Sequence, residues 1–115
     1  MIKIKDVEIL LSFVNWHPKL IELVRWFDFT FPGKLCITDG YRHGDKGCHG
    51  TEPLRAIDQR SWVFQDPKAI ADIINSKWEY DSKRPGKRVC YYHKTKSGAY
   101  HFHFQVHPNT RRKYG

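Results

Sequence analysis

Histidines alternate with apolar residues in the segment AYHFHFQVHP at 99–108. Side chains alternate between the two faces of a β-strand, so Phe102 and Phe104 would point to one face while His101 and His103 point to the other. The aromatic face is expected to pack against the core. The opposite face would be polar. It is either simply exposed to water or a place where imidazole nitrogens bind a metal ion.

Two further residues could complete a metal site with this pair. His49 lies in a glycine-rich segment at 39–50, and Asp58 directly follows the apolar pair Ala56-Ile57 in a segment with the character of a strand. A buried carboxylate is costly unless a cation compensates it. A hydrolytic zinc site needs three protein ligands and one open position, where the pKa of a bound water falls to about 7. Each signal also has an ordinary explanation, because His-x-His pairs are common on exposed strands and an aspartate after an apolar run often caps a strand end.

Hydrophobic spacing predicts two helices and four strands, in the order helix, strand, strand, helix, strand, strand. They are expected at 17–28, 34–38, 54–62, 66–80, 88–94 and 99–106, with a hairpin turn at 95–98. Asp66 and Pro67 suit the N-cap and the first position of the second helix. The segment at 6–14 is a short helix or an edge strand. This order indicates an α+β fold: a single small domain, residues 1–115, with a mainly antiparallel sheet and helices packed on one face.

The composition is that of an ordinary globular domain with a strong positive charge. The chain of 115 residues is 40% hydrophobic and 28% charged, and its formal net charge is +8. Such a charge favours anionic partners, of which an anionic cell wall is one, and it does not by itself single out nucleic acid. Three cysteines without paired spacing indicate a reducing compartment, and the N-terminal apolar run is too short to span a membrane. We expect a monomer that is made in the cytoplasm.

Three segments together resemble one enzyme family. ITDGYR at 37–42, HGTEPLRAID at 49–58 and YHFHFQV at 100–106 are similar to motifs of the zinc D-alanyl-D-alanine carboxypeptidases and L-alanyl-D-glutamate endopeptidases. This group includes many phage endolysins and shares its fold with the hedgehog signalling domain. The segments follow the order seen in the family, and the resemblance covers residues 34–107.

The resemblance implies a site for one zinc ion on His49, Asp58 and His103. Arg42 matches the family arginine that holds the substrate carbonyl and stabilises the developing oxyanion. A permanently charged, forked donor suits that role. A loop arginine can equally well pair with a neighbouring aspartate, so both explanations of Arg42 stay open.

The sequence departs from the family pattern at two points. The spacing from His49 to Asp58 is longer than usual, which a bulge in the loop could absorb. Many members carry a glutamate as general base three residues before the last ligand, where this chain has Tyr100. With a pKa of about 10, tyrosine is a poor base at neutral pH. The base is therefore expected to be His101, with Glu52 as a second candidate.

The resemblance and the charge together predict a zinc-dependent peptidase that cleaves peptidoglycan stem peptides next to a D-amino acid. We expect a phage-type lysis enzyme that acts on the cell wall after release from the cytoplasm. Two alternatives remain open. One is a non-catalytic zinc-binding module of the same fold. The other is a nucleic-acid-processing enzyme in which His101 and His103 hold a metal ion beside Tyr114, although such enzymes carry their tyrosine on a helix.

Overall fold

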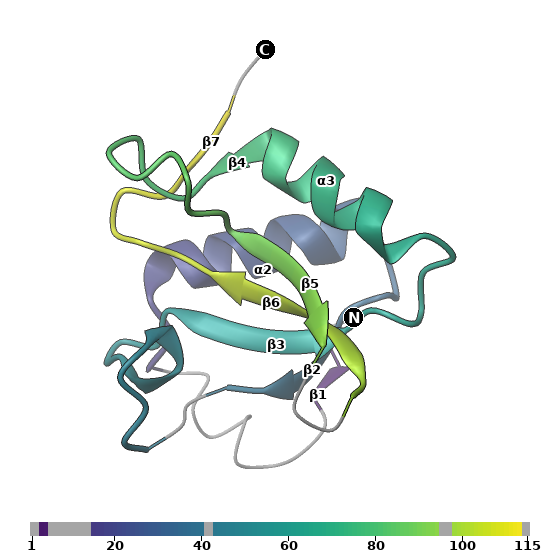
Figure 1. The fold of residues 1–115 in the computed structure, drawn as a ribbon, viewed down its shortest axis with the longest axis horizontal. Helices are drawn as coiled ribbons and strands as arrows, with labels where there is room; N and C mark the ends of the chain where they lie inside the picture. Colours follow the sequence, from purple (N-terminus) through teal and green to yellow (C-terminus); the bar gives the residue numbers. More distant parts are fainter. Residues whose placement is uncertain (1–2, 5–14, 41–42, 95–97, 114–115) are drawn as a thin grey trace.

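A five-stranded sheet, counted over the residues that the structure describes, forms the centre of the molecule (Figure 1). The structure is a computed structural model, and it describes residues 3–4, 15–40, 43–94 and 98–113. The strand order is β1-β2-β3-β6-β5; β1 and β2 run parallel, and the other neighbours run antiparallel. The strands are β1 (Lys3–Ile4), β2 (Cys36–Asp39), β3 (Ala56–Arg60), β5 (Cys90–Lys94) and β6 (Tyr100–Gln105).

The alternation along β6 sorts its side chains as the sequence predicts. Phe102 and Phe104 are fully buried on the face that carries the core. His101 and His103 are half-buried on the opposite face. The sheet therefore separates an apolar layer from a polar one.

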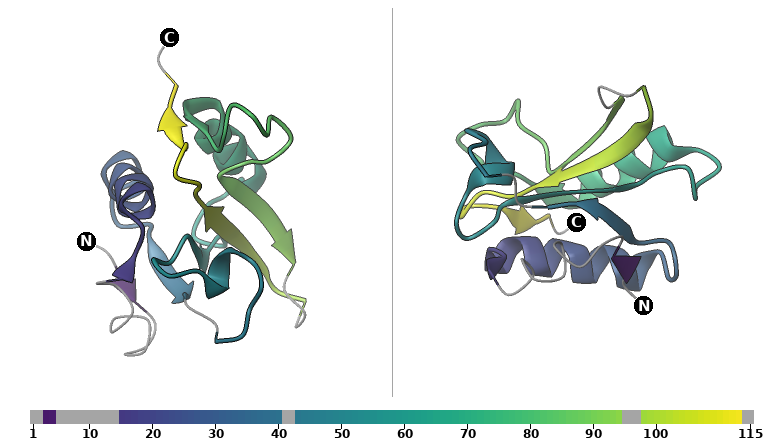
Figure 2. Two further views of the ribbon diagram at one scale, coloured as in Figure 1. Left: turned by 90° about the vertical axis from the view of Figure 1, so that its left-hand side faces the viewer. Right: turned by 90° about the horizontal axis from the view of Figure 1, so that it is seen from below.

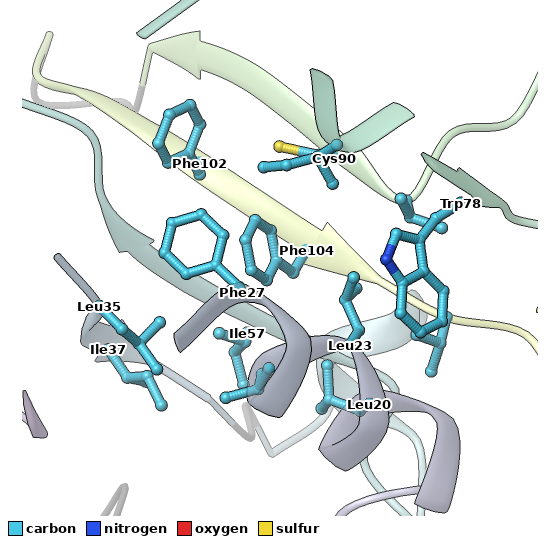
Figure 3. Packing of buried hydrophobic residues seen from close by; sticks show 14 of the residues in the cluster. Leu20, Leu23, Phe27, Leu35, Ile37, Ile57, Trp78, Cys90, Phe102 and Phe104 are labelled. Atoms are coloured by element: carbon cyan, nitrogen blue, oxygen red, sulfur yellow. The ribbon is translucent and has the colours of Figure 1, made fainter. Parts of the chain in front are cut away.

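Helix α2 (Pro18–Thr30) covers the core face of the sheet (Figure 2). His17 caps its start by accepting a hydrogen bond from the backbone N–H of Lys19. Its buried residues recur at helical spacing and are Leu20, Leu23, Val24 and Phe27. The ring of Phe27 lies 5.3 Å from the ring of Phe104, edge to face (Figure 3). Burial of each of these large apolar side chains stabilises the folded state by about 1.5–3 kcal/mol. The buried face of α2 therefore holds the helix against the sheet.

Helix α3 (Pro67–Lys77) packs against β5 and is shorter than predicted. The side chain of Asp66 caps its start, as the sequence predicts. The prediction that the helix continues to residue 80 is wrong. After its last turn the chain becomes extended, and β4 (Trp78–Glu79) pairs with β7 (Arg111–Arg112). The hydrogen bonds of this distant pairing override the local helical pattern, which is a weak preference by comparison.

The predicted fold class is confirmed in its general form. The described residues form a small, compact α+β domain with a mostly antiparallel sheet and two α-helices, and both helices bury side chains in one hydrophobic cluster. The radius of gyration is 13.2 Å, close to the value of about 13 Å expected for a folded chain of this length. Over the described ranges, no helix has the length and apolar character of a membrane span. The segment at 6–14 and residues 95–97 of the predicted turn lie outside the described residues.

Candidate metal centre

Strand pairing brings Asp58 and His103 together. The two residues face each other in the antiparallel register of β3 and β6, so their side chains leave the same face of the sheet. Asp58 Oδ1 lies 3.1 Å from His103 Nδ1. Asp58 is 3% exposed and stands in the middle of β3. Its carboxylate is therefore a buried charge with a specific partner, and it does not cap a strand end.

His49 reaches the same point from a loop that lies on the face of the sheet opposite α2 (Figure 2). It belongs to a short 3₁₀ turn, η2 (Cys48–Gly50), and is 5% exposed. Its Nε2 lies 3.2 Å from Asp58 Oδ1 and 3.2 Å from His103 Nδ1. Three donor atoms from three separate segments thus form a nearly equilateral triangle.

Tight packing of the loop fixes the position of His49. Gly50 leaves no room for a side chain, because a Cβ atom there would lie 1.8 Å from the backbone oxygen of Asp45. The hydroxyl of Thr51 accepts a hydrogen bond from the backbone N–H of Arg55, which ties the loop to the residue just before β3. The connection from His49 to Asp58, which is longer than in the family pattern, is therefore closed by a hydrogen bond between two of its own residues.

A hydrogen bond on its outer side orients each imidazole. His49 Nδ1 lies 2.7 Å from the carbonyl oxygen of Gly40, and His103 Nε2 lies 3.1 Å from Gln105 Oε1. The side-chain amide of Gln105 donates to the carbonyl of Arg88 at 2.9 Å, which directs its own oxygen to His103. Because oxygen accepts in both contacts, the outer nitrogen of each ring is the donor. In the neutral ring, the inner nitrogen then presents its lone pair to the triangle.

The triangle has the size that a zinc ion requires. With zinc–nitrogen and zinc–oxygen bonds of about 2.0–2.1 Å, neighbouring ligand atoms of a tetrahedral site lie about 3.3 Å apart. The three distances between donor atoms here are 3.1, 3.2 and 3.2 Å. Two imidazole nitrogens and a carboxylate oxygen are also donors that zinc accepts. The residues present therefore fit the expected metal, although other divalent ions share part of this preference.

The electrostatics of Asp58 favour a bound cation. Burial alone would raise the pKa of Asp58, but hydrogen bonds from the inner nitrogens of His103 and His49, when these carry protons, outweigh burial and hold this pKa well below its usual range. A bound cation would take the place of these inner protons. The carboxylate is therefore ionised at neutral pH. A buried negative charge between two inward-facing nitrogens attracts a positive ion.

Two more histidines extend the cluster toward solvent. His101 Nε2 lies 3.6 Å from Asp58 Oδ1. His93, which faces His101 in the register of β5 and β6, places its own Nε2 2.8 Å from His101 Nε2. The sequence prediction includes His101 and misses His93. The predicted hairpin pairs 88–94 with 99–106, but the face on which His93 lies depends on the register.

Solvent reaches the cluster from the side of β5 and β6. The side chains of His49 and Asp58 are 6% and 4% exposed, whereas those of His101 and His103 are 13% and 15% exposed. His93 is exposed. The side chains of His49 and Asp58 are thus the deeper part of the cluster, and the histidines of β6 lie on its more exposed side.

The remaining predicted site residues lie apart from this triangle or cannot be placed. Arg42 lies outside the described residues. Glu52 is exposed in the loop after η2, and it is not a member of the group formed by the three ligands. Tyr100, in place of the family glutamate, lies on the other face of β6 and stacks on the ring of Tyr92 at 4.8 Å. Cys48 is a free, half-buried thiol outside the three-member group.

No protein-family model, no curated protein and no solved structure matches this chain. The functional argument therefore depends on the residues and their geometry.

Proposed function

We propose that the protein is a zinc-dependent peptidase that cleaves peptidoglycan stem peptides next to a D-amino acid. The observation that carries the proposal is the triangle of His49 Nε2, Asp58 Oδ1 and His103 Nδ1, with sides of 3.1–3.2 Å. Within the described residues this group has three members, which leaves one corner of a tetrahedron for water or substrate. Three protein ligands and an open corner are typical of hydrolytic zinc sites, whereas structural sites use four protein ligands.

The chain's own residues have separate tasks in this proposal. His49, Asp58 and His103 hold the ion, and their outer hydrogen bonds keep the ligand atoms in place. A bound zinc ion would supply a Lewis acid that polarises the substrate carbonyl and makes hydroxide accessible at neutral pH. His101, next to the carboxylate of Asp58, takes up the proton of the attacking water and returns it to the leaving amine. His93 orients the ring of His101 through the contact between their Nε2 atoms.

The substrate class in this proposal is supported by sequence features. The segments at 37–42, 49–58 and 100–106 resemble those of zinc peptidases that act on D-amino acid bonds. The net charge of +8 would favour adsorption to an anionic wall. Arg42 keeps its proposed role of holding the substrate carbonyl.

The proposal is tested by metal analysis of the purified protein together with digestion of defined cell-wall peptides. We expect one zinc ion per chain and cleavage that is lost in His49→Ala, Asp58→Ala and His103→Ala. Zinc without cleavage of any peptide would instead support the non-catalytic module. Absence of a bound metal at a physiological zinc concentration would refute both.

A further inference from the structure

His93 and His101 form a second group of potential metal ligands at the edge of the candidate metal centre. The two residues face each other in the register of β5 and β6, so both side chains leave the face of the sheet that carries His103. His93 Nε2 lies 2.8 Å from His101 Nε2, whereas the centres of the two rings are 4.7 Å apart. The two Nε2 atoms are therefore turned toward each other, and a single ion beside them could bind both.

The distance between these two nitrogens differs from the distances inside the triangle of His49, Asp58 and His103. The sides of the triangle measure 3.1–3.2 Å, close to the spacing of about 3.3 Å in a tetrahedral site with bonds of about 2.0–2.1 Å. With bonds of about 2.0 Å, two ligands at right angles lie about 2.8 Å apart. The separation of 2.8 Å between His93 and His101 thus corresponds to neighbouring ligands of a tetragonal ion. Imidazole ligands in that geometry are typical of Ni²⁺ and Cu²⁺.

The surroundings of the pair favour a cation and leave room for its water ligands. Asp58 Oδ1 lies 3.6 Å from His101 Nε2, and its negative charge offsets part of the repulsion between an ion here and an ion in the triangle. His93 is exposed, and the side chain of His101 is 13% exposed. Water molecules can therefore complete the coordination of an ion that the protein holds through two nitrogens. Such an ion should bind more weakly than one in the buried triangle, which offers three protein ligands.

We propose that His93 and His101 form a second metal site, which binds a divalent ion of the nickel or copper type while zinc occupies the triangle. The ion displaces the proton that lies between the two rings, and this proton passes to solvent. The site itself does not depend on the peptidase function, but its effect on activity rests on that proposed function. Because Nε2 is the nitrogen of His101 that lies near Asp58, an ion on it removes the proposed general base, and the second ion inhibits the enzyme.

The second site is tested by calorimetric titration of Ni²⁺ into zinc-loaded protein. Ni²⁺ is the probe because Cu²⁺ would oxidise Cys48, which is a free, half-buried thiol. Wild type is compared with His93→Ala, His101→Ala and His43→Ala. His43 is an exposed histidine of the loop before η2 and belongs to neither group of ligands, so its variant is the matched control for the loss of one imidazole.

We expect wild type to bind one Ni²⁺ ion per chain and to retain its zinc. His93→Ala and His101→Ala should each weaken the binding of Ni²⁺ by at least about 10-fold, because even groups that only orient a ligating histidine are worth about 10- to 100-fold. His43→Ala should bind Ni²⁺ as wild type does.

Three results of the titration would count against the second site. Wild-type affinity for Ni²⁺ in His93→Ala would overturn it. Release of one zinc ion for each Ni²⁺ bound, measured with a chromogenic zinc indicator, would also overturn it, because Ni²⁺ would then occupy the triangle. Tighter binding of a second zinc ion than of Ni²⁺ would overturn the assignment to an ion with ligands at right angles.

A kinetic measurement tests the effect on activity separately. Zinc-loaded wild type, His93→Ala and His43→Ala digest the same cell-wall peptide at increasing concentrations of Ni²⁺. We expect saturating Ni²⁺ to lower kcat of wild type and of His43→Ala by about 100-fold or more, as loss of a general base does. The same concentrations should leave the kcat of His93→Ala nearly unchanged. Ni²⁺ that binds to wild type without lowering kcat would refute the inhibition. Failure of wild type to cleave the peptide would refute the peptidase, while the titration still decides whether the second site exists.

Discussion

His93 Nε2 lies 2.8 Å from His101 Nε2, across the neighbouring strands β5 and β6. One ring must donate and the other accept, so each fixes the tautomer of its partner. His101 Nε2 also lies 3.6 Å from Asp58 Oδ1, which places this pair beside the three candidate metal ligands. The cluster therefore has an inner part that can hold an ion and an outer part that can move a proton.

Mutation should separate the role of His101 and His93 in proton transfer from metal binding by the other three residues. We expect His101→Ala to retain zinc and to lower kcat about 10²- to 10⁴-fold, the usual contribution of a general base. His93→Ala should have a smaller effect, about 10-fold, because it removes an orienting contact and leaves the base in place. Metal content and kcat are measured on the same preparations. Full activity of His101→Ala would show that another residue is the general base, and Glu52→Gln would then be tested.

Removal of the metal should destabilise the fold, because the three ligands come from three segments. Zinc at 1,000 times its Kd stabilises a folded protein by about 4 kcal/mol, which corresponds to a change in Tm of roughly 10–20 °C for a domain of this size. We therefore expect EDTA to lower the Tm of the wild type by this amount in a calorimetric scan. Asp58→Asn serves as the control, since a site without its carboxylate should leave no response to EDTA. A wild-type Tm that stays the same when EDTA is added would contradict a metal centre.

Gln105 should affect metal affinity without being a ligand. Its Oε1 accepts from His103 Nε2, and its amide group donates to the carbonyl of Arg88. We expect Gln105→Leu to weaken zinc binding about 10- to 100-fold, as for other groups that orient a ligating histidine. Competition against a chromogenic chelator measures this affinity. Gln105→Glu retains the acceptor, so it should bind zinc more tightly than the leucine variant; the reverse order would argue against an orienting role.

Gly50 should be necessary for the loop that presents His49. A Cβ atom at this position would lie 1.8 Å from the backbone oxygen of Asp45, so the backbone of the loop must move to admit it. We expect Gly50→Ala to reduce the free energy of unfolding by about 1–3 kcal/mol, measured by urea denaturation, and to weaken zinc binding. Gly86→Ala is the matched control: a Cβ atom at residue 86 would have no atom of the described residues within 4 Å, so its effect should stay below about 1 kcal/mol.

Asp81 should make stability depend on pH. Hydrogen bonding from the backbone N–H of Lys83, together with the side chains of Arg84 and Asn109, lowers the pKa of Asp81 against the opposing effect of burial. Because the folded pKa lies below the unfolded one, this contribution to stability is fully present above the unfolded value of 3.8 and is lost as the pH falls through the folded value.

Asp81→Asn should therefore be less stable than wild type at pH 7, with a difference that shrinks as the pH falls below about 4. Urea denaturation at pH values from 7 down to 3 measures this difference. Asp72→Asn provides the comparison, since Asp72 forms an exposed ion pair with Lys68 and its loss should change stability by less than about 1 kcal/mol. A wild-type advantage over Asp81→Asn that persists unchanged at pH 3 would contradict the argument.

The sequence predicts the parts of the site that depend on local patterns. The alternation of β6 correctly separates His101 and His103 from Phe102 and Phe104. Asp58 is buried in the middle of β3, which decides between the two explanations that its position after an apolar pair leaves open. Local pattern is sufficient here because the two faces of a strand alternate with a fixed period.

The parts that sequence reasoning misses depend on pairing between distant segments. A turn confined to 95–98 would place Lys94 opposite Ala99, but the structure pairs Lys94 with Tyr100. This difference of one residue decides which side chain faces His101, and it brings His93 there. The pairing of β4 with β7 and the contact between Gln105 and His103 likewise have no local signal in the sequence.

The separation of the ligands along the chain has a consequence for how the site is made. His49 and His103 are 54 residues apart, and Asp58 meets His103 only after β6 has paired with β3. A chain in which β6 has not yet docked offers two of the three ligands and would bind the ion weakly. Metal uptake during refolding should thus report the docking of this strand, and a molecule in which β6 is still undocked would lack the complete candidate site.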